Sequence, residues 1–407
     1  MHTLRKLAEL SLAHAATFAF PLVFVVVCGR TLGVHDYGVV SLYTALAAFL
    51  GVLIEFGFDW YGTREVAQSA ADTARCRRIL WNVTAARLLV CAVVGVVSTG
   101  ALLMFRGSGE WPLILASAFY LFGFALDANW YLRALERTQL LLRITVGVRM
   151  AGVVLLVLIV TAPGDLAAAL WSYAFISLAT SALTWIVLLR LGLAARAPVD
   201  FGDIARLLRG SGVILFGNLN GAMLTNGGIA LLGFTADPAT VGAANLALRV
   251  RMAGDAVLLP LKQLGFVRIS SFAKDSRARA VNVGRRVLVA LVAVATVVAA
   301  IAAWSAPWVA HYVFKAELPT AIGLIALLAL SIPVNAAGNL FGMQSLIAFG
   351  HERAYTAILL VAAFGFCMVV AFARDPLAYG WALLLAEVVV MILSALRLRV
   401  VVAEVTR

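Results

Sequence analysis

The sequence predicts an all-α, polytopic membrane protein, and three observations indicate this fold class. Of its 407 residues, 63% are hydrophobic and only 13% are charged, and the mean hydropathy is +0.99; soluble domains carry about 25% charged residues. The apolar residues come in blocks of about 20, the length at which a helix crosses the hydrocarbon core of a bilayer. Within these blocks polar and apolar residues do not alternate, which excludes a closed β-barrel.

The apolar blocks predict twelve transmembrane helices. They cover residues 10–31, 38–57, 79–104, 111–132, 141–161, 166–190, 211–233, 241–264, 286–310, 319–347, 354–373 and 376–396. An even number of spans places both termini on the same side of the membrane.

Basic residues predict which side this is. Of the 32 lysines and arginines, 23 fall in connectors and ends on one side, and four fall on the other, namely Arg30, Arg106, Lys315 and Arg374. This bias places both termini in the cytosol. The net charge of +12 therefore reflects topology and contact with anionic lipids, and no nucleic-acid partner is expected.

The chain divides at a polar loop around Pro198 into two predicted six-helix bundles, residues 1–197 and 198–407. External connectors are short, and three longer loops are expected on the cytosolic side: Asp59–Arg78, Gly192–Gly210 and Ser270–Arg286.

A weak internal repeat supports this division. Gly217–Gly221 reads GNLNG and Gly338–Gly342 reads GNLFG, and glycines four residues apart allow close helix packing. Asn218 and Asn339, within these segments, are candidates for polar residues of a transport path. Repeated halves around a central cavity are typical of transporters.

Five cations lie inside predicted spans, where a charge costs a few kcal/mol unless it faces a cavity or a partner. They are Arg87, Arg149, Arg249, Arg251 and Lys262. They either pair across helices or line a cationic lumen, and such a lumen would suit an anionic substrate such as a phosphate-bearing lipid. Lys262, near the cytosolic end of its span, could also reach the membrane surface.

The eighth span concentrates these charges. Arg251, Asp255 and Lys262 fall within about 40° of one another on a helical wheel, whereas Asn245 and Arg249 share another face. Asn245 is, like Asn218 and Asn339, a candidate for a polar residue of the lumen. Arg251 and Asp255, four residues apart, could simply neutralise each other.

Glu387, in the middle of the twelfth span, is either a proton carrier or a hydrogen-bonded structural carboxylate. Together with Asp255 it is a candidate for coupling transport to an ion.

Sequence motifs for catalysis are missing. None of the four lysines follows a glycine as in a phosphate-binding loop, and neither a HExxH nor a Gly-x-Ser-x-Gly motif occurs. The four cysteines show no spacing typical of a metal site or a disulfide framework. We therefore expect a protein that is not an enzyme and that uses no metal or cofactor.

The segment Glu55–Ala67, EFGFDWYGTREVA, stands at the predicted exit of the second span into the cytosol. Its glycines, Gly57 and Gly62, should let the chain leave the helix. Thr63 should cap a new helix with Glu65 in its first turn. Arg64 should pair with Asp59 or with a lipid phosphate. The segment is expected to form an elbow at the cytosolic rim.

Leu32–Gly38, Glu55–Phe58 and Gly62–Ala67 together resemble the polysaccharide repeat-unit flippases. These are also called O-antigen or exopolysaccharide translocases. They belong to the multidrug/oligosaccharidyl-lipid/polysaccharide exporter superfamily, which includes the multidrug and toxin extruders. The match is specific in about the first 90 residues; beyond them it depends on the twelve-span plan and the repeat.

This resemblance implies two six-helix lobes around a central cavity in the bacterial inner membrane. It implies that an undecaprenyl-diphosphate-linked oligosaccharide moves from the cytosolic to the periplasmic leaflet by alternating access, for surface polysaccharide synthesis. Cationic residues in the lumen are typical of this family. The resemblance implies this role for Arg249 and Arg251, and also for Arg87 and Arg149, because these residues lie within predicted spans. The expected partners are the lipid-linked oligosaccharide, membrane lipids, and the polymerase and other glycan-assembly proteins.

Two alternatives stay open. One is an ion-coupled small-molecule or drug exporter of the same superfamily; those extruders often carry an acid in span one, where this chain has only Glu9. The other is a membrane-embedded glycopolymer polymerase or acyltransferase, which would need a large external loop or an acidic-histidine cluster. The coupling ion is left open between a proton, sodium and none.

Overall fold

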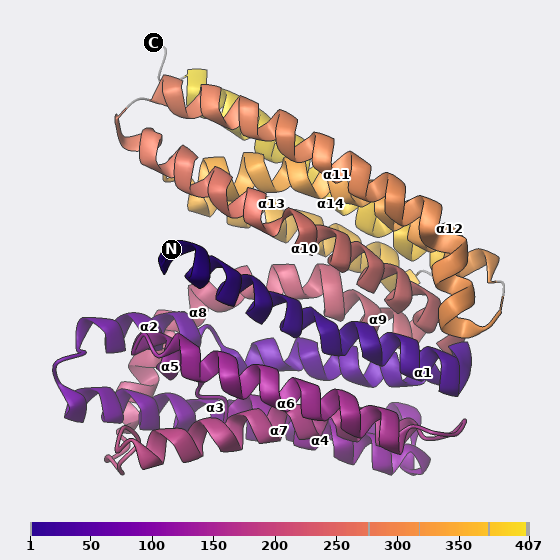
Figure 1. Ribbon diagram of the computed structural model, residues 1–407, viewed down its shortest axis with the longest axis horizontal. Helices are drawn as coiled ribbons and strands as arrows, with labels where there is room; N and C mark the ends of the chain where they lie inside the picture. The colour runs from indigo at the N-terminus through magenta and orange to yellow at the C-terminus, as the bar shows by residue number, and fades with distance from the viewer. Residues whose placement is uncertain (1, 276, 317, 373–374, 404–407) are drawn as a thin grey trace. The chain divides into compact units, whose positions relative to one another are not determined.

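The computed structural model describes residues 2–275, 277–316, 318–372 and 375–403, except the side chains of residues 2–19, 213, 273–275, 277, 278 and 280. Across these ranges the chain is helical, with short turns and no strand (Figure 1). The predicted all-α class is therefore confirmed. Arg374 and the side chain of Glu9 lie outside the described residues.

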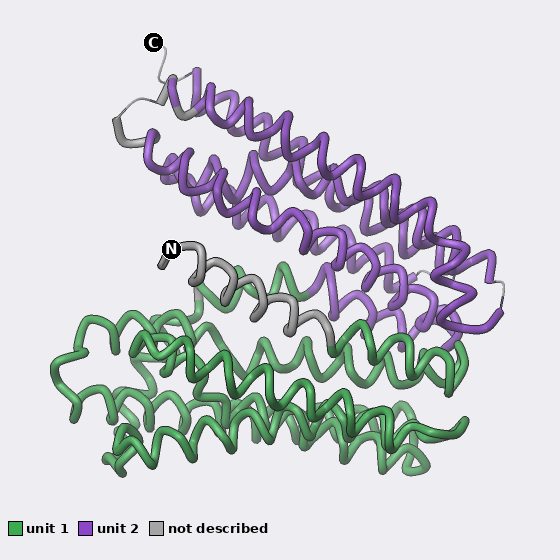
Figure 2. Tube along the Cα trace, viewed as in Figure 1, with its two compact units in different colours: residues 1–222 green, residues 223–407 purple. Residues whose placement is uncertain are grey.

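The chain forms two compact units, residues 1–222 and 223–407 (Figure 2). Unit 1 contains α1 (His2–Glu55), α2 (Phe58–Gln68), α3 (Thr73–Arg106), the 3₁₀ turn η1 (Ser108–Glu110), α4 (Trp111–Ala125), α5 (Asn129–Ala134), α6 (Thr138–Ile159), α7 (Leu166–Arg190) and α8 (Phe201–Ala222). The unit boundary follows α8, whereas the predicted boundary between residues 197 and 198 precedes it. The division into repeated six-helix halves at residues 197 and 198 remains a prediction.

Unit 2 contains the remaining helices. They are the π-helical turn η2 (Met223–Gly227), α9 (Gly228–Thr235), α10 (Pro238–Asp275), α11 (Arg277–Phe314), α12 (Pro319–Asn339), the π-helical turn η3 (Leu340–Leu346), α13 (Glu352–Phe372) and α14 (Pro376–Ala403).

Membrane-length helices cover ten of the twelve predicted spans. In the described part of the chain, nine helical stretches are long and apolar enough to cross a membrane. The first, Phe20–Gln68, holds the first two predicted spans, because these are joined within α1. The seventh predicted span, in α8 and α9, and the eighth, in α10, are not among the nine. In α10 the charged residues Arg249, Arg251, Asp255 and Lys262 interrupt the apolar sequence.

Several predicted loops are helical instead. The expected connector Gly33–Tyr37 lies inside α1, where only Gly33 leaves the helical conformation, with φ +81° and ψ 173°. The expected cytosolic loop Asp59–Arg78 is α2 followed by the first turns of α3. Its charges and glycines led to the prediction of a loop, whereas the segment contains a short amphipathic helix, α2, that packs on α5, α3 and α8.

Proline and aspartate mark where several helices begin. α10, α12 and α14 start at Pro238, Pro319 and Pro376, positions at which the missing N–H removes no helical hydrogen bond. Before α10, the Asp237 carboxylate accepts hydrogen bonds from the backbone N–H of Thr240, at 3.0 Å, and from its hydroxyl, at 2.6 Å. These bonds hold the pKa of Asp237 below its usual value.

Each unit has its own packed interior. In unit 1, α4 packs against α1 and α7, and α6 packs against the same two helices (Figure 1). Trp130 and Tyr131 of α5 and Phe58 of α2 are fully buried. In unit 2, α12 packs against α10, α11 and α14. These two interiors enclose the polar groups described next.

Candidate functional site: two buried charge clusters

The first cluster lies inside unit 2 and is centred on Arg251 of α10. Its guanidinium donates a hydrogen bond to Oε1 of Glu387 on α14, and Nη2 lies 3.5 Å from Oδ2 of Asp255, one turn along its own helix. The side chains of Arg251 and Glu387 are both 5% exposed. The pairing of Arg251 with Asp255, expected from their spacing, is confirmed.

Two further residues extend this cluster, which we call the Arg251 cluster (Arg251, Asp255, Lys262, Asn335 and Glu387). Lys262 Nζ lies 3.4 Å from Oδ1 of Asp255 and donates to Oδ1 of Asn335 at 3.2 Å. Asn335, on α12, donates through Nδ2 to Glu387 Oε1 at 3.4 Å. Three helices, α10, α12 and α14, therefore contribute to one polar network within an apolar bundle.

The Arg251 cluster leaves polar atoms unused. Nε of Arg251, Oε2 of Glu387 and the nearby hydroxyl of Tyr379 are buried, and none of them has a hydrogen-bond partner among the described residues. Buried polar atoms are normally paired. Nε of the buried Arg87 in unit 1 is also without a partner among the described residues, so the distinguishing feature of the Arg251 cluster is the unpaired carboxylate oxygen of Glu387.

Arg249 lies two residues before Arg251 on α10 and differs from it in exposure and in pairing. Its side chain is partly exposed, and it has no ion pair or hydrogen bond within the described chain. Asn245, predicted on the same helix face, is buried at 3% exposure. Arg249 thus carries a charge that the described part of unit 2 does not neutralise.

The second cluster lies in unit 1 and is centred on Arg87 of α3, which is completely buried. Its guanidinium donates to Oδ1 of Asp59 and, through Nη1, to the backbone carbonyl oxygens of Asp127 at 2.6 Å and Phe124 at 3.5 Å. Arg133 donates to the other oxygen of Asp59 at 2.9 Å. We call these residues, together with Asp127, the Arg87 cluster.

The partners of the elbow residues differ from those expected. Asp59, in the first turn of α2, pairs with Arg87 and Arg133 and not with Arg64. Arg64 is exposed, lies 3.8 Å from Glu65, and places its guanidinium 5.4 Å from the ring centre of Tyr61. Glu65 accepts from Arg75 at 3.3 Å. The predicted Arg64–Asp59 pair is wrong because α2 turns these two residues to different sides of the helix.

The turn itself is made by Phe56 and Gly57, with φ of +48° and +75°. At Gly57 a Cβ would lie 2.8 Å from Ile214 of α8, so both the dihedral and the close approach require glycine. The predicted exit at Gly57 is confirmed, but the predicted exit at Gly62 and the predicted helix cap at Thr63 are wrong. Both lie inside α2, where Gly62 touches the buried Trp130.

The other predicted site residues lie outside both clusters. Arg149, on α6, is partly buried and in electrostatic range of Tyr120 and Tyr173. Asn218, on α8, is partly exposed. Asn339, at the end of α12, accepts a hydrogen bond from Gln344 at 3.1 Å. The structure does not bring these three residues to a common site within either unit.

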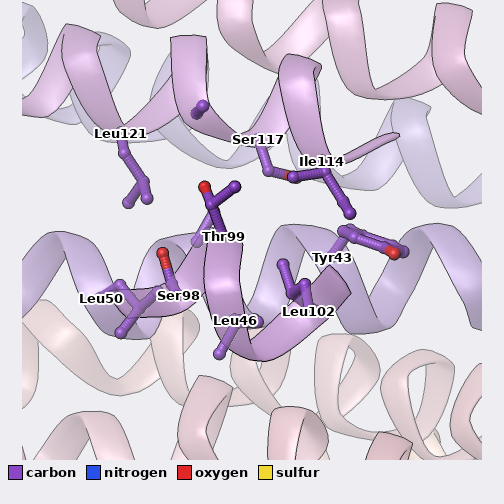
Figure 3. A pocket seen from close by; sticks show the side chains of 11 residues that line it. Tyr43, Leu46, Leu50, Ser98, Thr99, Leu102, Ile114, Ser117 and Leu121 are labelled. Atoms are coloured by element: carbon purple, nitrogen blue, oxygen red, sulfur yellow. The ribbon is translucent and has the colours of Figure 1, made fainter. Parts of the chain in front are cut away.

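A small apolar pocket lies between α1, α3 and α4 of unit 1 (Figure 3). Side chains including Tyr43, Leu50, Leu102 and Leu121 surround it (Figure 3), and its volume is about 10 Å³. That is room for about one water molecule. It is a packing gap and not a substrate site.

Sequence reasoning missed two members of the clusters. Asn335 is a polar residue within an apolar helix, two positions after Pro333, and this isolation was the signal that could have revealed it. Arg133 was counted as a topological charge, and no local pattern marks it as a partner of Asp59.

The length and hydropathy of the membrane-length helices define a multi-pass helical membrane protein. A solved structure titled lipid II flippase MurJ, inward closed conformation, aligns with 95% of this chain and 87% of its own, with a TM-score of 0.72 and 11% identity. An inward-facing multidrug resistance MATE transporter of the MOP superfamily aligns with 96% of this chain and 95% of its own, with a TM-score of 0.71 and 14% identity. At such identities the likeness concerns the fold.

Sequence comparison identifies the family. The profile of the family described as polysaccharide biosynthesis protein matches residues 3–266, well over half of the chain, and the chain belongs to this family. A protein of Shigella dysenteriae named as an O-antigen transporter is 27% identical over 272 residues, covering 65% of this chain and 67% of the relative. Its namesake in Escherichia coli K12 is 20% identical over 359 residues, covering 88% and 86%. The predicted family is therefore confirmed.

Proposed function

We propose that this protein is a flippase that moves a polyprenyl-diphosphate-linked oligosaccharide repeat unit across the bacterial inner membrane for surface polysaccharide synthesis. Membership of the polysaccharide biosynthesis family supports the pathway, and the O-antigen transporters among its relatives support the substrate class. The protein performs no covalent chemistry in this proposal. Alternating access between two six-helix halves moves the substrate, and both termini stay in the cytosol.

The observation that carries the proposal is the state of Arg249. Arg87, Arg251 and Lys262 have ion-pair partners within the described chain, whereas Arg249 has none and its side chain is partly exposed. An unpaired guanidinium at membrane depth is costly unless an anion meets it. We assign the diphosphate of the substrate as this anion, because Arg forms strong charge-assisted hydrogen bonds with phosphate.

Ion coupling is proposed at the Arg251 cluster. Glu387 and Asp255 are its two carboxylates, and Oε2 of Glu387 has no hydrogen-bond partner among the described residues. A proton or a cation bound to these carboxylates would weaken their ion pairs with Arg251, which lies two residues from Arg249 on α10.

The test is transport by an Arg249→Gln variant in a bacterial strain whose own repeat-unit flippase is deleted and replaced by this gene. Loss of a charge-assisted contact should reduce the export of lipid-linked repeat units by about tenfold to a hundredfold. Surface glycan should fall, while the lipid-linked repeat accumulates on the cytosolic leaflet. Arg249→Lys, which keeps the charge, should retain part of the activity.

The matched control is Arg143→Gln. Arg143 is an exposed arginine of α6 in unit 1 with no ion pair in the described chain. Equal insertion of all variants into the membrane is measured by immunoblot. If Arg249→Gln exports repeat units at the rate of the control, Arg249 does not bind the diphosphate; if the unchanged protein restores no surface glycan, the flippase assignment itself is wrong.

A further inference from the structure

A pocket of about 290 Å³, lined by several charged residues, lies within unit 1 between α2, α3 and α8, and no residue of the Arg87 cluster lines it. Its volume is at the lower end of the range for small-molecule sites. Two of its residues, Tyr61 and Glu65, belong to the segment Glu55–Ala67 that carries the family resemblance. The positive-inside bias predicts that this end of the unit faces the cytosol.

The inner wall of the pocket is rigidly built. Asn82 of α3 is only 2% exposed, and its Nδ2 donates to Oδ2 of Asp203 on α8 at 3.1 Å. Its Oδ1 accepts from the backbone N–H of Asp200 at 3.0 Å. Asn82 thereby fixes both the start of α8 and the orientation of the Asp203 carboxylate.

The charges around the pocket are mostly balanced in pairs. Arg75 lies 3.3 Å from Glu65, and Arg206 donates to Asp203. Arg78 is different, because it is exposed and has no ion pair or hydrogen bond within the described chain. The hydroxyl of Tyr61, whose side chain is partly exposed, also has no partner among the described residues.

This mixture of groups favours one class of ligand. Arg78 and the Tyr61 hydroxyl offer hydrogen-bond donors, while Asp203 and Glu65 offer acceptors around an aromatic ring. Sugar hydroxyl groups donate and accept in the same way, and an aromatic ring can cover the apolar face of a sugar. Three arginines, Arg75, Arg78 and Arg206, also line the pocket and would attract a phosphate. Arg75 and Arg206 are already paired with Glu65 and Asp203, so a phosphate would have to compete with these two carboxylates, whereas a neutral sugar would not.

We propose that this pocket binds a neutral sugar ring of the glycan at the cytosolic end of unit 1, before translocation. The proposal deepens the flippase assignment and rests on it for the origin of the sugar. It gives the elbow segment a binding role through Tyr61 and Glu65. The diphosphate and the sugar are then recognised by different residues, Arg249 for the first and the pocket for the second.

The experiment measures sugar binding to the purified full-length protein in phospholipid nanodiscs by saturation-transfer NMR. The probes are free glucose, galactose, N-acetylglucosamine and rhamnose, with inorganic pyrophosphate as the anionic probe. The variants are Arg78→Met and Tyr61→Phe, each of which removes a hydrogen-bond donor that has no partner among the described residues. Arg143→Met is the control, since it removes an exposed arginine of the same unit that does not line the pocket.

We expect at least one sugar to bind, and each variant to weaken its binding by about threefold to tenfold, the effect of one lost hydrogen bond. The control should bind as the unchanged protein does. The proposal is overturned if none of the sugars binds, if both variants bind like the control, or if pyrophosphate displaces the sugar from the pocket. Sugar binding is measured without transport. A negative result in the flippase assay therefore does not affect the interpretation of the binding experiment, and a negative binding result does not affect the interpretation of the flippase assay.

Discussion

Unit 1 and unit 2 each bury an arginine among acidic side chains, but they satisfy the two guanidinium groups by different means. Arg87 binds Asp59 and also the carbonyl oxygens of Phe124 and Asp127, which lie where α4 ends. The last carbonyls of a helix have no intrahelical partner and attract cations. Arg251 lies inside α10, where the neighbouring backbone carbonyls take part in helical hydrogen bonds, and its partners are the side chains of Asp255 and Glu387.

This difference separates a structural cluster from a candidate for function. The acids of the Arg87 cluster lie near helix ends, Asp59 has a second cation in Arg133, and the side chains of Asp59 and Asp127 are 22% exposed. The Arg251 cluster has Glu387 at 5% exposure and leaves its Oε2 unpaired among the described residues. Protonation or ion binding would therefore change the Arg251 cluster more than the Arg87 cluster.

The largest expected effect is that of Arg251→Met. It leaves the Glu387 carboxylate buried without its counter-charge, and removing one partner of a buried pair costs about 3–5 kcal/mol of unfolding free energy. Adding Glu387→Gln should recover part of this loss, because the buried charge is then also removed. Denaturant-induced unfolding in detergent micelles, followed by tryptophan fluorescence, measures both variants.

Arg249→Met is the matched control for this measurement, since Arg249 is on the same helix but has no partner within the described chain. It should not lower the unfolding free energy, because no pairing within the described chain is lost. Equal losses for Arg251→Met and Arg249→Met would show that the Arg251 pairing does not stabilise unit 2.

A smaller loss, about 2–3 kcal/mol, is expected for Arg87→Met. The carbonyl of Asp127 loses its donor, but Asp59 keeps Arg133 at 2.9 Å and part of its contact with solvent. Adding Asp59→Asn should recover little, in contrast to the recovery expected for Glu387→Gln. The same unfolding assay measures both variants. A loss of unfolding free energy for Arg87→Met larger than that for Arg251→Met would contradict the prediction that Arg251 contributes more to stability than Arg87.

The two clusters also differ in how far the sequence predicted them. Arg251 and Asp255 could be paired because a helix brings residues four apart together, whereas Glu387 and Asn335 join them only through the packing of α12 and α14. The Arg87 cluster was not predictable for another reason. Half of its hydrogen bonds go to backbone carbonyls, whose availability depends on where α4 ends, and its acid Asp59 lies on α2, which the sequence presented as a loop.

The elbow segment shows the same limit on a smaller scale. The turn at Gly57 followed from a glycine at the end of an apolar block, and the structure confirms it. The role of Gly62 did not follow, because only the buried ring of Trp130, 68 residues later in the chain, explains why that position has no side chain.

The smallest expected effects concern the outer cation of each cluster, Lys262 and Arg133, and they test burial directly. Lys262 is 14% exposed and reaches Asp255 and Asn335, so Lys262→Gln should cost about 1.5 kcal/mol. Arg133 is 48% exposed, and Arg133→Gln should lower the unfolding free energy by less than about 1 kcal/mol, as is usual for surface ion pairs.

Added sodium chloride screens exposed charges more than buried ones. Salt should therefore abolish the effect of Arg133→Gln on the unfolding free energy and leave that of Lys262→Gln. If both effects vanish in salt, the Arg251 cluster is open to solvent, and Glu387 need not lose its charge to release Arg251.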